Sequence, residues 1–85
     1  MDYTTEYVDV TLSRPIDLDG TQVSSLRMRE PTVHDQIACQ SIKGSTAQQE
    51  VTLFANLCGI APDNIQKLRL RDYRKLQDAY SNFLE

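Results

Sequence analysis

The sequence predicts an α+β fold in which an N-terminal β-hairpin is followed by three or four packed helices. Two patterns predict it. Apolar and polar residues alternate along the first third of the chain, and apolar residues recur every three or four positions along the rest. With 85 residues, the chain has the length of one small domain. We therefore expect a single domain over 1–85, with a loose N-terminus at 1–6, the hairpin at 7–30 and the helical part at 32–84.

The hairpin is predicted from two alternating segments on either side of a turn signal. Residues 7–12 place their valines and leucine on one face, which is typical of a half-buried strand. Ser13-Arg14-Pro15 is expected to end this strand, because proline cannot donate a hydrogen bond to a ladder, although Ile16 and Leu18 could lengthen it. Asp19-Gly20 favours a tight turn, because glycine accepts a positive φ. The return strand is then expected over 23–29.

The segment between the two predicted layers favours a strand-to-helix joint. Pro31 forms its corner and keeps Glu30 extended, because proline disfavours a helical conformation in the residue before it. Thr32 occupies the N-cap position and Asp35 follows three residues later, which is the spacing of a capping box. Arg29 and Glu30 have no role in the cap, and we expect them to form an ion pair with a neighbouring strand or helix.

The helix that follows this cap is predicted to be short. Val33, Ile37, Ala38 and Ile42 fall on one stripe, and Gly44 ends the helix. A hairpin alone is marginal in water, so we expect the helices to cover its apolar face.

The next helix is predicted to run from Ser45 or Thr46 to Cys58. Either Ser45 with Gln48 or Thr46 with Gln49 fits a capping box. The apolar residues of this helix fall on two stripes, so we expect it at the centre of the core. A helix of about two turns then begins at Pro62, and an amphipathic helix is predicted over 72–84.

The charge of the chain argues against nucleic-acid binding. The net charge is −3, and residues 1–65 carry −5 while residues 66–85 carry +2. A nucleic-acid-binding protein normally has a basic surplus. The C-terminal bases, called the basic cluster below, are either a solvated helical face or a docking face for an acidic partner. They are Lys67, Arg69, Arg71, Arg74 and Lys75.

No pattern in the chain predicts a catalytic residue, a metal or a cofactor. His34 is the single histidine, and Asp35 beside it would point about 100° away on a helix. Cys39 and Cys58 lack the spacing of zinc ligands, and the three glycines form no phosphate loop. We expect both cysteines to be reduced and mostly buried in a cytoplasmic protein, because no signal peptide or membrane span is recognisable.

Several short pieces, taken in their order and spacing, resemble the small tail assembly chaperones of Mu-like and related contractile-tailed phages (the E, 41 and 14 type). They are Leu26, Arg29-Glu30-Pro31-Thr32 with Asp35, then Ala55, Leu57, Gly59 and Pro62, and finally Asp72-Tyr73 with Leu76, Gln77 and Phe83. The resemblance implies a non-enzymatic protein of a phage or prophage. It implies that the protein binds the tape measure protein and keeps it soluble during tail assembly. It also implies a longer form made by frameshifting, and action in the bacterial cytoplasm rather than in the mature virion.

The resemblance does not indicate which residues contact the partner, so we infer them from the sequence. The candidates for partner binding are the arginines and aromatic residues near the C-terminus: Arg69, Arg71, Tyr73, Arg74, Tyr80 and Phe83. The alternative is that these aromatic residues simply fill the core. The hairpin edge is a second candidate for docking or self-association. A structural or adaptor protein of the tail is the alternative function; an enzyme or DNA-binding regulator fits the acidic composition poorly.

Overall fold

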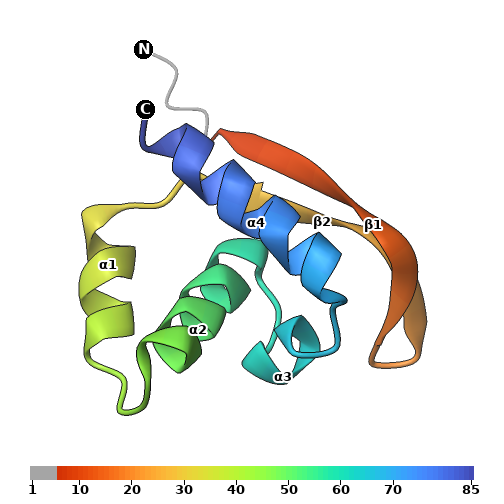
Figure 1. The fold of residues 1–85 in the computed structure, drawn as a ribbon, viewed down its shortest axis with the longest axis horizontal. Helices are drawn as coiled ribbons and strands as arrows, with labels where there is room; N and C mark the ends of the chain where they lie inside the picture. Colours follow the sequence, from red (N-terminus) through yellow and green to blue (C-terminus); the bar gives the residue numbers. More distant parts are fainter. Residues whose placement is uncertain (1–5) are drawn as a thin grey trace.

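The computed structural model describes residues 6–85, and within them it has the predicted α+β architecture. An antiparallel hairpin precedes a run of helices (Figure 1). The elements are β1 (Tyr7–Leu18), β2 (Thr21–Arg29), α1 (Val33–Gln40), α2 (Thr46–Cys58), α3 (Pro62–Ile65) and α4 (Leu70–Phe83). Of the loose start expected at 1–6, residues 1–5 lie outside the described part.

The hairpin turns at Asp19-Gly20, as predicted, but its first strand is longer than expected. Both turn residues have positive φ, 52° and 90°, which matches the right-handed twist of the flanking strands. Ser13-Arg14-Pro15 does not end the strand. Thr11 pairs with Ser25 and Ile16 with Val23, so β1 holds three more residues than β2 between these pairs. The proline lies in this irregular stretch, where it disturbs no ladder hydrogen bond.

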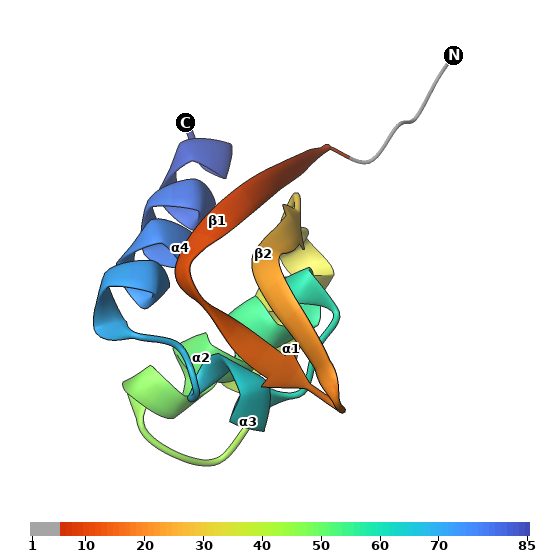
Figure 2. The same cartoon turned by 90° about the vertical axis from the view of Figure 1, so that its right-hand side faces the viewer.

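The two strands of the hairpin are packed against different helices. Figure 2 shows α4 alongside β1, while α2 packs against β2. The core between them is contributed mainly by inward-facing strand residues and by α2, as expected for a central helix. Its most deeply buried side chains are Met28, Phe54, Leu57, Ile65 and Leu76.

Helix α2 begins and ends with well-formed caps. Of the two capping boxes that fit the sequence, the structure contains the one at Ser45, with Gln48 as its partner. Gly59 closes the helix at a φ of 69°, a left-handed conformation that glycine adopts at little cost. These caps place the end of α2 next to α3.

Helix α1 does not face the core with its apolar stripe. Val33 is 77% exposed and Ile37 is 59% exposed, whereas Asp35 and Cys39 are buried. The expectation that this stripe covers the hairpin is therefore wrong. Helix α1 instead packs against α2, and the ion pair between Arg29 and Asp35, described below, ties its first turn to the end of β2.

The last two helices are separate elements. Helix α3 is a single turn rather than the two turns expected, and α4 starts at Leu70, two residues earlier than predicted. Neither helix has a side-chain N-cap hydrogen bond. The connection at residues 66–69 leads from the buried Ile65 to α4 and carries part of the basic cluster on the surface.

Candidate partner-binding surface

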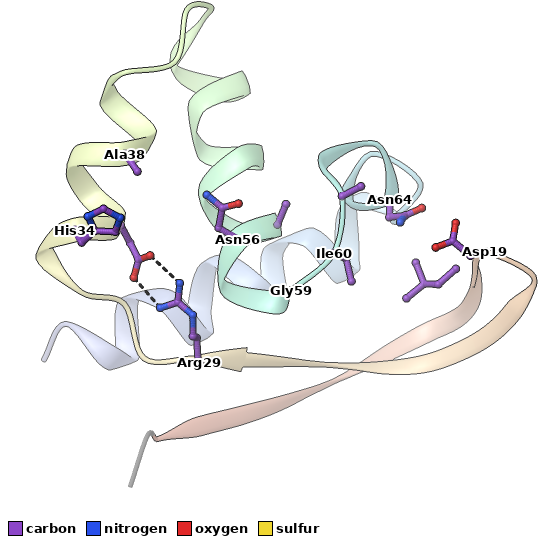
Figure 3. Close-up of a pocket in the computed structure, with 12 residues that line it drawn as sticks. Asp19, Arg29, His34, Ala38, Asn56, Gly59, Ile60 and Asn64 are labelled. Atoms are coloured by element: carbon purple, nitrogen blue, oxygen red, sulfur yellow. Dashed lines mark hydrogen bonds and ion pairs between the residues drawn. The ribbon is translucent and has the colours of Figure 1, made fainter. Parts of the chain in front are cut away.

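The joint between β2 and α1 contains the predicted capping box and a closely paired arginine. The Thr32 side chain accepts a hydrogen bond from the Asp35 amide, and the Asp35 carboxylate accepts one from the Thr32 amide at 2.8 Å. Arg29 donates through both terminal nitrogens to the same carboxylate, at 2.7 and 2.8 Å (Figure 3). The ion pair expected for Arg29 thus forms with the following helix. The Glu30 carboxylate contacts no base among the described residues.

The pKa of Asp35 follows from these contacts. The Arg29 guanidinium holds the pKa of this buried carboxyl well below its ordinary value, and the Thr32 amide and hydroxyl lower it further. Asp35 is therefore ionised wherever the protein is folded near neutral pH, and it cannot act as a proton donor there. Its role is to attach α1 to the end of β2.

Removing the cap at Thr32 is expected to weaken the protein moderately. Thr32→Ala deletes the acceptor for the Asp35 amide, and the loss of such an N-cap costs about 0.5–2 kcal/mol. Urea unfolding followed by circular dichroism measures the change. Thr52→Ala, which removes a hydroxyl bonded only to a carbonyl of its own helix, is the control with a smaller effect. Equal stability of Thr32→Ala and the wild type would contradict the capping role.

Stability should fall in acid because two buried carboxylates have lowered pKa values. Asp35 and Asp72 both titrate below the ordinary Asp value in the folded protein. Their stabilising effect is complete above the unfolded pKa of about 3.9 and is lost as the pH falls through the folded values. The free energy of unfolding should therefore decline from about pH 5 downward, with a shallower decline for Asp35→Asn. A constant or rising value between pH 5 and pH 2.5 would refute this expectation.

A cleft of about 750 Å³ lies between this joint, the hairpin turn, α2 and α3 (Figure 3). It is lined by small residues such as Ala38, Ala55 and Gly59 and by the polar residues His34, Asn56 and Asn64. None of its lining residues is a serine, threonine, cysteine or lysine. Among the residues that the structure describes, the cleft therefore brings no hydroxyl, thiol or amine nucleophile beside His34.

The two thiols are not bonded to each other, and neither lines this cleft. Cys39 is buried, and burial raises the pKa of Cys58 to about 11. The Cys58 thiol is therefore protonated at neutral pH and is a poor nucleophile. In the described part of the chain, no group of three His, Cys, Asp or Glu side chains is placed to hold a metal ion.

A second polar contact, absent from the sequence-based prediction, joins α4 to the irregular stretch of β1. Asp72 is 1% exposed and accepts hydrogen bonds from both the amide and the hydroxyl of Ser13, each at 2.9 Å. Burial by itself raises the pKa of Asp72, but these bonds and the charge of Lys75 lower it overall. The one signal in the sequence was the place of Asp72 in the family pattern, which did not identify Ser13 as its partner.

The two lysines of the basic cluster also contact β1, so their amines are already engaged and are not free to bind a partner. Lys67 donates to the Asp17 carbonyl at 2.9 Å, and Lys75 donates to the Thr11 carbonyl at 2.8 Å. Together with Asp72, they attach α4 and the connection before it along the outer edge of β1. The charged groups of these two lysines therefore have a structural role.

The other three bases of the cluster are exposed. The side chains of Arg69, Arg71 and Arg74 form no hydrogen bond or ion pair with other residues in 6–85. Beside them is a small apolar notch of about 200 Å³, lined by Val51, Ile65, Gln66, Leu68, Leu70 and Tyr73. We call these three arginines and the notch the basic corner. Its residues belong to α2, to α3 and α4 and to the connection between these two helices, which Figure 1 shows as a ribbon.

The three aromatic residues predicted to bind a partner also have a structural role. The rings of Tyr73 and Tyr80 each lie 5.5 Å from the ring of Phe54. The Tyr73 hydroxyl donates to Glu50 at 2.6 Å, and Phe83 packs at the margin of the core. All three predicted aromatic residues are half-buried, so each contributes to the core and keeps part of its surface in solvent. Their role in partner binding stays a prediction.

Comparison with known proteins identifies the class to which the chain belongs. A model of phage tail assembly chaperones matches residues 9–85, which include almost all of the hairpin and every helix described above. The chain therefore belongs to this family, described as phage tail assembly chaperone proteins, E, or 41 or 14. The family resemblance expected from the sequence is thus confirmed. No curated protein and no solved structure matched the chain.

None of the helices within residues 6–85 combines the length and the apolar character needed to cross a membrane.

Proposed function

We propose that this protein binds the tape measure protein of its phage or prophage and keeps it soluble until the tail tube assembles around it. The observation that carries the proposal is the family match over residues 9–85. A chaperone of this kind acts by reversible binding and needs no catalytic residues, so we propose that it is not an enzyme. The cleft at His34 is lined by no serine, threonine, cysteine or lysine of the described residues, which agrees with this proposal.

The surface of the described domain supports binding by a limited patch. Its arginines at 69, 71 and 74 have no partner within the domain and lie beside an apolar notch. Exposed apolar groups rimmed by charges mark interaction sites more often than scattered apolar residues do. Such a patch allows a helical client to be held and then released.

We propose that the protein acts in the cytoplasm of the bacterial host and is not retained in the mature virion. A frameshifted longer form of the chain would be a second partner or an alternative carrier of the same domain. Sequencing the gene past its stop codon tests this last point. A slippery site followed by a long overlapping frame is expected there, and a stop in both frames would exclude the longer form.

Deletion of the gene from an inducible prophage tests the function in the cell. Lysates should contain heads without tails, and a plasmid copy of the gene should restore tails. Mass spectrometry of purified virions from the parent prophage should find no peptides of this protein. If the protein is present in finished particles in fixed proportion to tail proteins, it is a structural or adaptor component and the proposal of a chaperone is wrong.

A further inference from the structure

We propose that the basic corner selects an acidic, helical segment of the partner, with one apolar side chain in the notch and carboxylates on the arginines. The inference rests on the proposed function and names the class of tape measure segment that the chaperone would recognise. It depends on three features of the structure: an apolar notch of side-chain size, positive charge without compensation, and a rigid support for both.

The notch has the size and character of a site for one apolar side chain. Its volume is about 200 Å³, which exceeds the roughly 150 Å³ of an apolar protein cavity that binds benzene. Ile65 forms its buried floor, and Leu70, 67% exposed, stands at its rim. An entering leucine or phenylalanine would cover Leu70 and remove apolar surface from water on both sides of the contact.

The arginines around the notch favour an acidic partner. Leu70 and Arg74 are four residues apart on α4, so they are neighbours on the helix surface. Arg69 directly precedes α4 and Arg71 lies in its first turn, where the positive end of the helix dipole adds to their charge. A guanidinium group binds a carboxylate through two parallel hydrogen bonds, which gives the contact direction as well as charge.

The acidic groups near these arginines are already engaged or do not pair with them. Asp72 is buried against Ser13, and Glu50 accepts hydrogen bonds from Tyr73 and Gln77 at 2.6 and 2.9 Å. Asp78 lies four residues from Arg74 but makes no ion pair with it. The positive charge of the basic corner is thus not neutralised from within residues 6–85, although the domain as a whole is acidic.

The notch is supported by elements that are held in place. Tyr73 is fixed by the ring of Phe54 on one side and by Glu50 at its hydroxyl. Lys67, Asp72 and Lys75 attach the segments on both sides of the basic corner to β1. A preformed site loses less entropy on binding than a mobile one. Arg71 and Arg74 are three residues apart on α4 and are therefore neighbours on its surface, which suits carboxylates one turn apart on a partner helix.

Binding to peptides tests the inference. The tape measure protein encoded with this chain is divided into overlapping peptides of about 30 residues, and each is titrated by fluorescence anisotropy in low and high salt. The tightest peptides should carry carboxylates three or four residues from an apolar residue, and salt should weaken their binding. Replacing those carboxylates with their amides should raise the Kd about tenfold.

Variants of the domain locate the contact. Arg69→Glu with Arg71→Glu and Arg74→Glu should weaken binding at least about tenfold, and Leu70→Ala about fivefold. Peptides in which the same carboxylates become lysines should restore binding to the charge-reversed variant. Lys43→Glu and Ile37→Ala, an exposed base and an exposed apolar residue on the α1 side, are the matched controls and should bind normally. Circular dichroism checks that every variant is folded.

Three results would overturn the inference. One is full affinity of the charge-reversed variant for the intact tape measure protein, which would leave the proposed function standing and place the contact elsewhere. Another is a tightest peptide that is neutral or basic. The third is equal affinity for a DNA duplex, which would make the basic corner a general polyanion site. If the wild-type protein binds neither the intact tape measure protein nor any peptide, both the inference and the proposed function are wrong.

Discussion

Replacing Phe54 with alanine is expected to lower the free energy of unfolding by about 3–5 kcal/mol, the cost of removing a buried aromatic side chain. Phe54 is 1% exposed and lies on the central helix α2. Its ring is in contact with both Tyr73 and Tyr80 of α4, with centroid separations of 5.5 Å. Alanine would leave a cavity between α2 and α4 that neither tyrosine can fill without losing its own contacts.

Urea unfolding gives this change directly. Phe54→Leu keeps much of the volume and should be considerably less destabilising than Phe54→Ala, because the cost of a core truncation grows with the cavity that remains. Phe83→Ala, at the margin of the core, is a control of the same chemistry with a smaller expected loss. A loss below about 1 kcal/mol for Phe54→Ala would show that the centre of the core lies elsewhere.

Asp72→Ala is expected to cost about 2–3 kcal/mol, because it removes a buried carboxylate that accepts hydrogen bonds from both the amide and the hydroxyl of Ser13. It also removes the carboxylate that lies 3.5 Å from the Lys75 amine. The polar attachment of α4 to β1 would then depend on Lys75, with Lys67 holding the connection before the helix. Such a loss is a large share of the stability of a domain with 85 residues.

The contribution of Asp72 can be separated from that of its partners. Ser13→Ala removes the hydroxyl but keeps the amide bond to Asp72, so it should cost only about 1 kcal/mol. In the Asp72→Ala background, Ser13→Ala should add almost nothing, because the two residues form one contact. Additive losses in this double-mutant cycle would contradict the predicted coupling between the irregular stretch of β1 and α4.

The elements that could be predicted from the sequence are those determined by local signals. The Asp19-Gly20 turn, the cap at Thr32 and the two apolar stripes of α2 each depend on residues within a few positions of one another. Each signal determines the conformation of the segment in which it occurs, so the fold class and most element positions follow from them. The resemblance to the family was recognisable because its pieces keep a fixed order and spacing.

The features that could not be predicted depend on residues far apart in the chain. Pro15 ends a strand by local rules, but β1 pairs with β2 again from Ile16, and Asp72, 59 residues after Ser13, accepts hydrogen bonds from the irregular stretch. Helix α1 packs against α2 and is tied to β2 by the pair between Arg29 and Asp35, while Val33 and Ile37 on its apolar stripe stay exposed. A hydrophobic pattern alone gives no weight to a buried carboxylate.

The roles of the five bases in the basic cluster also could not be predicted from the sequence. Its five bases look equivalent in the sequence, and their separation into two groups follows only from the position of β1. Lys67 and Lys75 reach main-chain carbonyls of that strand, and the three arginines do not. The fold was therefore needed to separate the two lysines that bond to β1 from the three arginines that do not. These arginines form the charged part of the basic corner.

Co-expression with the tape measure protein tests the central claim most directly. The two proteins are produced together in a bacterial host, and the tape measure protein is measured in the soluble and pelleted fractions, with and without this chain. We expect it to be soluble and to co-purify with this chain when both are present, and to precipitate when it is produced alone. Equal solubility in both cases, with no co-purification, would contradict the claim that this protein is the chaperone of the tape measure protein.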